Sequence, residues 1–349
     1  MTKGEGIRGK AFVVGAFEHP LREIPDRSTH QVLAEVALGA LADAGLSLGD
    51  VDGYFCDSSL GFGPMSMTDY LGLHPIHVDS TDTGGSSYLV HVGHAAEAIA
   101  AGRCTVALVA MAGRPRSSAM RRPSSAEPTP DAVFEGLWGM TGAVTGYALA
   151  ATRHMHEFGT TGAQLAEVKV AASLHAQHNP NAYLREPVTV DEVLESPMIS
   201  SPLHRLDCCV VTDGGGAVVV VSSEVARQLE RTSVKVLGHG EAVKHADNGR
   251  LDLTSTGAVI SGPLAFEEAG VMPADVDYAS IYDSFTITVV ETIEDLGFCA
   301  KGEGGRFVSD GALVAPAGRL PFNTDGGGLC NNHPSNRGGM TKIIEAVRQ

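Results

Sequence analysis

Two short segments in the last third of the chain hold side chains that can move protons. Asn332-His333-Pro334 follows a run of glycines and precedes a predicted helix, and a histidine in such a turn can polarise a carbonyl group or shuttle a proton. Tyr282-Asp283 lies at the end of a predicted strand, where α/β sheets place functional groups. A phenol, with an ordinary pKa of about 10, suits acid/base work on an alcohol. We predict Tyr282 and His333 as catalytic residues and Asp283 as a hydrogen-bonding neighbour.

The first third of the chain supplies elements that can position such residues. KAFVVGAF (10–17) and CTVALVAMAG (104–113) read as buried strands, and VDGYFC and HPIHVDS as shorter ones. Residues 28–46 carry apolar side chains at helical spacing, begin at a Ser/Thr cap and end at glycine. A second helix, rich in small residues, is expected at 86–102. This β-α-β-α-β order predicts an α/β fold with a parallel sheet.

The rest of the chain divides into an insertion and a repeat. Residues 114–204 begin polar and rich in Arg, Ser and Pro and continue as helices, which indicates an inserted loop domain. Residues 206–223 predict two strands that complete the first sheet, so 1–113 plus 205–228 form one half. Residues 229–349 repeat the scheme, with strands at 234–242 and 278–285 and a last helix at 336–349 that matches 86–102. We expect this second half to lack its final two strands.

Composition excludes several classes of protein. The formal net charge of −16 argues against a nucleic-acid partner, which needs clustered Lys and Arg. The chain has no apolar run long enough for a membrane span and no secretory signal at its start, so a cytoplasmic protein is expected. The six cysteines form no C-x-x-C pair and are expected to be reduced thiols. His91 and His94 are three residues apart on one helix without a third ligand nearby, so we predict core or interface histidines and no metal site.

Eight segments form a pattern of motifs along the chain: VGAFEHP, ADAGL followed by VDGYFC, GGSSYLVHVGHAAEAIAAG, RHMHEFGTT, PLHRLDCCVVTDGG, YDSFT, EDLGFC followed by KGEGG, and GGGLCNNHPSNRGG. In their order and spacing these motifs resemble the thiolase superfamily, and more narrowly the sterol-carrier-protein-x type thiolases and the steroid side-chain aldolases. The resemblance covers essentially the whole chain. It implies a five-layer αβαβα sandwich of two like halves with an inserted loop domain, in agreement with the repeat above.

At the nucleophile position of this family the sequence departs from the thiolase pattern. A thiolase uses a cysteine at the N-terminus of the central helix of its first half, where the helix dipole favours a thiolate. The matching residue here is Gly85, which cannot form an acyl-enzyme, and Ser86 and Ser87 are off-register. The family's Gly-His-Pro motif reads Asn332-His333-Pro334. The steroid side-chain aldolases are similar in lacking the cysteine and in using tyrosine in the region of Tyr282.

The resemblance therefore implies a lyase that cleaves a bulky, steroid-like β-hydroxyacyl-CoA by a retro-aldol reaction, with Tyr282 or His333 as the base. Coenzyme A enters as part of the substrate, and no covalently bound cofactor is expected. Related enzymes imply a homodimer and a small OB-fold/zinc-ribbon partner that holds the acyl-CoA. Two alternatives stay open: a thiolase or acetyl-CoA acyltransferase acting on a β-ketoacyl-CoA, and a non-catalytic scaffold subunit. The remaining groups expected around substrate are Gly85, Ser86, Asn332 and Asp283 at the thioester or its oxyanion, and Arg114 and Arg116 at the coenzyme A phosphates.

Overall fold

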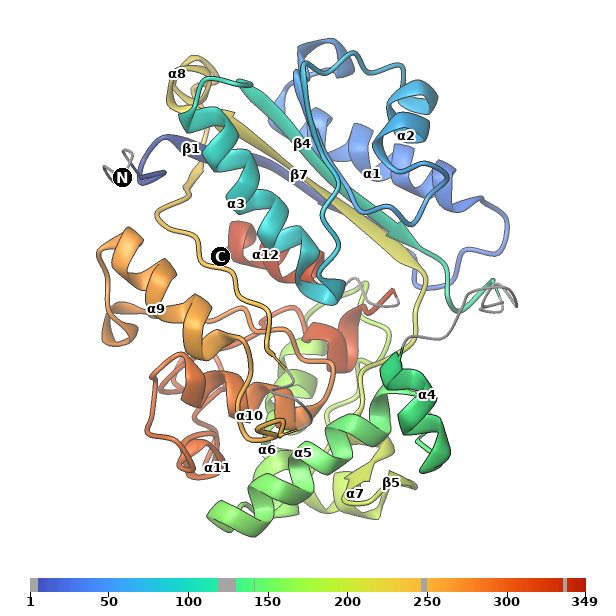
Figure 1. Cartoon of the computed structure of the whole chain (residues 1–349), viewed down its shortest axis with the longest axis vertical. Coiled ribbons are helices and arrows are strands. Elements are labelled where there is room, and N and C mark those ends of the chain that lie inside the picture. The colour runs from blue at the N-terminus through green and yellow to red at the C-terminus, as the bar shows by residue number, and fades with distance from the viewer. Residues whose placement is uncertain (1–5, 119–129, 141, 246–249, 335–337) are drawn as a thin grey trace.

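A computed structural model describes residues 6–118, 130–140, 142–245, 250–334 and 338–349, and its centre is a six-stranded sheet (Figure 1). The strand order is β3-β2-β4-β7-β1-β8. β2 runs parallel to β3 and β4, whereas β7 is antiparallel to both β4 and β1, so the expectation of a parallel sheet is wrong for this part. β7 enters the sheet after the loop domain, and no βα crossover fixes its direction. The strands are β1 (Ala11–Glu18), β2 (Gly53–Phe55), β3 (His77–Asp79), β4 (Val106–Gly113), β7 (Gly214–Ser222) and β8 (Val234–Lys235).

Helices cover both faces of this sheet (Figure 1). On one face lie α1 (Thr29–Ala44) and α2 (Pro64–Leu71), and the buried Leu41 packs there against the strands. On the other face α3 (Ser87–Ala100) and α12 (Gly339–Arg348) lie side by side, and Tyr88 of α3 and Met340 of α12 share one apolar core with the sheet. Full burial of each such side chain contributes about 1.5–3 kcal/mol. This packing fixes α12 beside α3.

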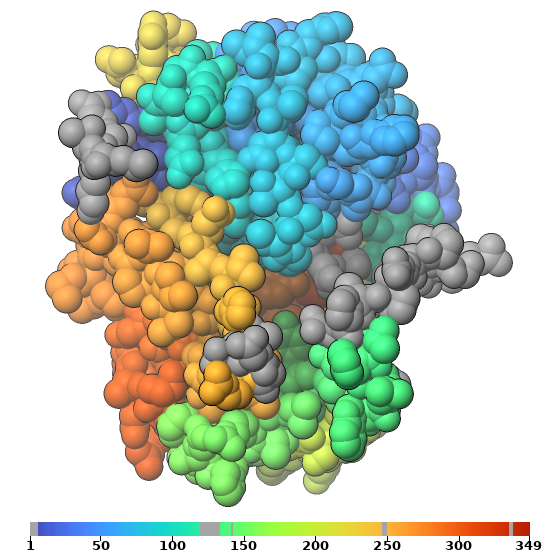
Figure 2. All heavy atoms as spheres, in the orientation of Figure 1, coloured from blue at the N-terminus to red at the C-terminus, as the bar shows by residue number. Residues whose placement is uncertain are grey.

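A second, mainly helical body packs below the sheet (Figures 1 and 2). Its core brings together residues of the predicted loop domain and of the predicted second half: Leu165 and Val168 pack with Ile287, Val290 and Phe322. No helix within the described ranges is long and apolar enough to cross a membrane. The remaining helices and strands are α4 (Pro130–Leu137), α5 (Ala143–Phe158), α6 (Gly162–Ala176), α7 (Val190–Glu195), β5 (Met198–Ser200), β6 (Leu203–His204), α8 (Ser223–Gln228), α9 (Ala258–Ala269), α10 (Thr286–Asp295) and α11 (Gly304–Phe307).

Three predicted strands differ from the structure. Residues 206–213 lie outside the sheet, where Leu206 and Asp207 belong to a 3-10 turn and Cys208 forms only an isolated bridge. Of residues 234–242, only Val234–Lys235 pairs with the sheet. Within 278–285, Ala279 forms a single parallel bridge to Phe322 and Phe285 a single antiparallel one to Cys208. The backbone N–H and carbonyl groups of Ile281 are hydrogen-bonded to a side chain. The N–H donates to Asn323 Oδ1 (2.9 Å), and Asn323 Nδ2 donates to the carbonyl oxygen (2.8 Å). An amide side chain therefore replaces a neighbouring strand just before Tyr282.

Candidate active site

The N-termini of the two central helices meet below the sheet. A 3-10 turn, Gly84–Ser86, leads into α3, and the first residue of α12 is Gly339. A Cβ atom at Gly339 would overlap the carbonyl oxygen of Gly85, so the two backbones approach this closely only because residue 339 is glycine. The N-terminus of each helix carries a positive partial charge and N–H groups without a partner inside the helix. The arrangement favours a negatively charged oxygen here.

The Tyr282 side chain lies between these two helix ends. A Cβ atom at Gly85 would overlap both Cζ and the hydroxyl of Tyr282, and one at Gly338 would lie 2.6 Å from Tyr282 Cε2. Any side chain at residue 85 would need the space that the phenol fills. The tyrosine and a cysteine nucleophile at the family position are therefore mutually exclusive in this conformation.

Tyr282 and His333 form a hydrogen-bonded pair. The Tyr282 hydroxyl is 2.8 Å from His333 Nε2, and the His333 backbone N–H donates to Thr212 Oγ1 (2.9 Å). Burial lowers the pKa of His333 to about 4, an effect that the nearby Lys342 reinforces and the nearby Asp283 opposes. Burial raises the pKa of Tyr282 well above its ordinary value. At neutral pH both groups are uncharged, so the phenol can donate its proton to the imidazole.

Asp283 is a buried structural anchor for the pair. Its carboxylate accepts hydrogen bonds from the backbone N–H groups of Gly328 (2.8 Å) and Leu329 (3.1 Å), and it lies 2.9 Å from Lys342 Nζ. Burial opposes the charge of Lys342, but Asp283 and Asp325 more than offset it and raise the pKa of the ammonium group. The ion pair ties α12 to the end of the 278–285 segment. Lys342 is not among the sequence-predicted site residues.

Asn332 is held by the protein on both sides of its amide. Nδ2 donates to Glu18 Oε1 (2.8 Å), and Oδ1 accepts from Thr212 Oγ1 (2.7 Å). The same Thr212 hydroxyl accepts the His333 backbone N–H, so this buried network positions the histidine. Ser86, by contrast, is exposed on the turn before α3 and has no described contact with Tyr282 or His333.

The two arginines predicted at the phosphates make internal contacts. Arg114 donates to the carbonyl oxygens of Ile24 (2.8 Å) and Pro25 (3.2 Å). Arg116 pairs with an exposed glutamate and lies over the ring of Tyr183, with its guanidinium carbon 4.7 Å from the ring centroid. Arg114 therefore holds a neighbouring loop, while the Arg116 side chain stays partly exposed.

No cysteine has the environment of an activated thiolate, and all six lie in the described part of the chain. Burial raises the pKa of Cys56, Cys104, Cys209 and Cys299 to about 12, that of Cys208 to about 11, and that of Cys330 as well. Cys209 also lies close to Tyr282, which the sequence did not indicate. Its backbone N–H donates to the carbonyl oxygen of Ser284 (2.9 Å), and its thiol contributes to the raised pKa of Tyr282.

Comparison with known proteins identifies the family. Residues 240–349 match the family model described as thiolase C-terminal domain-like. An acetyl-CoA acetyltransferase of Methanothermobacter thermautotrophicus is 33% identical over 97% of this chain and 90% of its own. The chain belongs to the thiolase superfamily.

Two further relatives in this superfamily carry a different activity in their names. A 17-hydroxy-3-oxo-4-pregnene-20-carboxyl-CoA lyase of Mycobacterium tuberculosis is 34% identical, with 98% of this chain and 92% of that protein aligned. The solved structure of an Ltp2-ChsH2(DUF35) aldolase superposes with a TM-score of 0.88 at 32% identity and covers 98% of this chain and 90% of that one. Identity to the transferase and to the lyase is nearly equal, so the site residues must distinguish between the two chemistries.

Proposed function

We propose that this protein is a carbon–carbon lyase that cleaves a β-hydroxyacyl-CoA by a retro-aldol reaction. The observation that carries the proposal is the Tyr282 hydroxyl, which fills the space of a nucleophile at residue 85 and lies 2.8 Å from His333 Nε2. A retro-aldol cleavage needs a group that takes a hydroxyl proton and needs no covalent nucleophile. The names of the lyase and aldolase relatives agree with this reading.

The reaction balances with the groups at hand. Tyr282 accepts the proton of the substrate β-hydroxyl while its own proton passes to His333 Nε2. The Cα–Cβ bond breaks, the β-carbon becomes a carbonyl, and the bond's electron pair forms the enolate of the thioester. Tyr282 then donates a proton to Cα and takes one back from His333. The products are a ketone or aldehyde and a shortened acyl-CoA. Because the pKa of His333 is lowered to about 4, its imidazolium form gives the proton back readily.

The enolate oxygen is best placed at the paired helix ends. The N-terminal turns before α3 and at the start of α12 meet where Gly339 lies against the carbonyl oxygen of Gly85. Preorganised backbone donors at such a point stabilise an oxyanion, and removing one typically costs about 10²–10³ in rate. We place the thioester carbonyl here, with Gly85 as a donor and Asn332 as the residue that positions His333.

A thiolase mechanism is the alternative, and the environment of the cysteines disfavours it. Acyl transfer needs a thiolate near the thioester, whereas burial raises the pKa of Cys209, which belongs to the surroundings of Tyr282, to about 12. A scaffold without activity would have no need of a proton-transfer pair. Substituting Tyr282 and His333 would leave a scaffold's function intact.

The names of two relatives support a proposal for the substrate class and for a partner. The name of the M. tuberculosis lyase specifies a steroid acyl-CoA, and the aldolase structure contains a second, DUF35 protein. We propose a bulky, steroid-like acyl-CoA for this chain, a small OB-fold/zinc-ribbon partner, a homodimer and a cytoplasmic location. Arg116, and less directly Arg114, would face the coenzyme A phosphates.

Product analysis tests the proposal. The purified chain, with its partner where one co-purifies, is incubated with a steroid side-chain β-hydroxyacyl-CoA or with the matching β-ketoacyl-CoA plus free coenzyme A. We expect a ketone and a shortened acyl-CoA from the hydroxy substrate without added coenzyme A. If only the keto substrate is cleaved, by thiolysis with free coenzyme A, the protein is a transferase. If neither substrate is turned over, the scaffold is favoured.

A further inference from the structure

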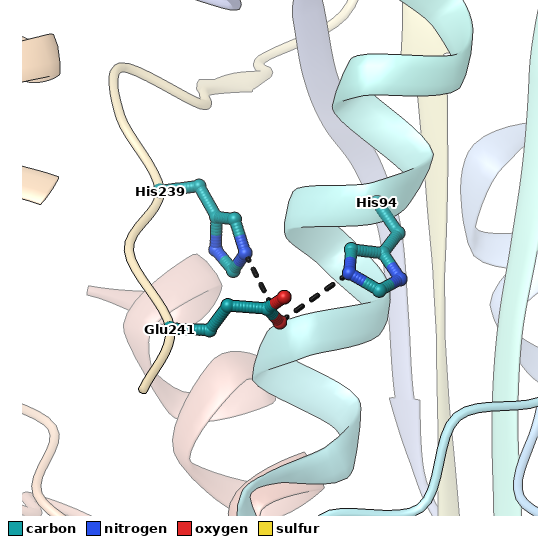
Figure 3. A group of neighbouring side chains, drawn as sticks. All are labelled: His94, His239 and Glu241. Carbon is teal, nitrogen blue, oxygen red and sulfur yellow. Dashed lines mark ion pairs between the residues drawn. The ribbon is translucent and has the colours of Figure 1, made fainter. Parts of the chain in front are cut away.

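Three side chains capable of binding a metal ion meet between α3 and the segment that follows β8 (Figure 3). His94 comes from α3, and His239 and Glu241 from the extended segment that follows β8. Glu241 Oε2 is 3.3 Å from His94 Nε2 and 3.7 Å from His239 Nε2, and the three ligand atoms lie within 4.8 Å of one another. Ligands at about 2.0–2.2 Å from one Zn²⁺ ion have such mutual distances.

The surroundings orient the two imidazoles toward a common point. His94 Nδ1 is 2.5 Å from Asp79 Oδ2, which leaves Nε2 directed at Glu241. A carboxylate on the far nitrogen is the usual support of a metal-binding histidine, because it fixes the tautomer and makes the ring a better ligand. His239 Nε2 is buried and has no hydrogen-bond partner among the described residues, so a ligand atom is available there.

The chain is built to let His239 reach this position. A Cβ atom at Gly93 would overlap the His239 ring, so glycine on α3 admits the imidazole next to His94. The His239 backbone N–H donates to Glu268 Oε2 (2.9 Å), which anchors the segment. The two rings stand edge to face with centroids 6.0 Å apart. His91, the histidine that the sequence pairs with His94, instead directs Nε2 at the carbonyl of Thr81 (2.9 Å).

We propose that His94, His239 and Glu241 bind one divalent transition-metal ion, Zn²⁺ or a similar ion, with water completing a tetrahedral site. The donor set of two imidazoles and one carboxylate suits Zn²⁺. His94 lies nine residues along α3 from Gly85, about 13 Å at 1.5 Å per residue, so the ion does not touch the reacting atoms. It joins α3 of the first half to the beginning of the second half and stabilises that junction. The proposal differs from the sequence-based prediction of no metal site.

Metal titration of the tag-free full chain, without its partner, tests the site. After EDTA treatment and desalting, Co²⁺ is added as the probe, followed by Zn²⁺. We expect one equivalent of Co²⁺ with the intense visible absorption of a tetrahedral site, its displacement by Zn²⁺, and a higher Tm with either ion. Wild-type protein without stoichiometric binding would overturn the proposal and leave the three residues as a proton-sharing cluster.

Matched variants assign the ligands. His239→Gln and Glu241→Gln should each lower metal affinity at least tenfold and abolish the rise in Tm. Glu241 has a half-exposed side chain, so Glu241→Gln should keep the apo Tm within a few degrees of wild type. His156→Gln, which removes an exposed histidine at the end of α5, serves as the control and should bind like wild type. Unchanged binding in both ligand variants would refute the assignment.

Discussion

The hydroxyl of Tyr282 occupies the space that a side chain at residue 85 would need. We predict that residue 85 matches the position of the cysteine nucleophile in the thiolase pattern. In this conformation a cysteine side chain there and the Tyr282 ring would exclude each other. Under the proposed lyase mechanism, the phenol acts as a proton-transfer group where a thiolase carries a covalent nucleophile.

Gly85→Ala should disrupt this contact. The added methyl group overlaps the Tyr282 ring, so we expect a loss of about 1–3 kcal/mol in unfolding free energy and at least a tenfold loss of lyase activity. Gly146→Ala is the matched control, because a Cβ atom there meets nothing within 4 Å. Adding Tyr282→Ala to Gly85→Ala relieves the overlap but leaves a cavity, so the two losses of stability should not add, and activity should stay lost. A Gly85→Ala enzyme with wild-type turnover and Tm would contradict the contact.

Tyr282→Phe should separate chemistry from packing. The ring is retained and only the hydroxyl that faces His333 Nε2 is lost, so we expect kcat to fall by about 10²–10⁴ with little change in KM. Steady-state kinetics with the hydroxyacyl-CoA measure this, and circular dichroism checks the fold. The exposed Tyr70 provides a Tyr→Phe control that should leave kcat unchanged. A rise in KM with kcat unchanged would make Tyr282 a substrate-contacting residue and not the proton acceptor.

The buried His333 predicts how stability depends on pH. Its pKa is about 4 in the folded protein and about 6.5 when unfolded, so the unfolded chain binds more protons between these values. The stability associated with the neutral imidazole is fully present above pH 6.5 and is lost as the pH falls toward 4, by at most roughly 3 kcal/mol. Urea unfolding at several pH values should therefore show a shallower acid decline for His333→Gln than for wild type. Equal declines would mean that His333 is not held neutral.

The Asp283–Lys342 pair should behave as a buried ion pair. Asp283→Asn leaves the Lys342 ammonium group without its carboxylate, and we expect a loss of about 3–5 kcal/mol. The double variant Asp283→Asn/Lys342→Met removes both charges and should lose less than the sum of the single variants. Denaturant unfolding of the four proteins gives the coupling energy. Additive losses would contradict a direct pair and leave only the hydrogen bonds to Gly328 and Leu329.

The elements that sequence predicted well are those with local signals. α1 begins after Ser28, whose side chain caps the helix, and ends at Gly45 in a left-handed conformation, and both residues are visible in the sequence. The apolar run of β4 likewise predicts a fully buried strand. The strand expected at 278–285 failed because a strand also needs a neighbour, and the Asn323 side chain takes that neighbour's place. That pairing is a tertiary property.

The candidate site divides in the same way. The motifs around Tyr282 and His333 are visible in the sequence, and the structure brings the two side chains within 2.8 Å. Lys342 was missed because a lone lysine on a short helix usually faces solvent, and its burial against Asp283 is a result of tertiary packing. His239 was missed for a related reason: it joins His94 across a long stretch of chain, and no local spacing records that contact.

The most direct test of the central claim is turnover of the hydroxyacyl-CoA in D₂O, with mass spectra of both the products and the intact protein. If Tyr282 and His333 transfer the hydroxyl proton to Cα, the shortened acyl-CoA carries one deuterium at Cα, cleavage needs no free coenzyme A, and the protein mass stays unchanged during turnover. A protein adduct with the mass of the acyl group, or cleavage only when free coenzyme A is added, would contradict the account and indicate a covalent nucleophile.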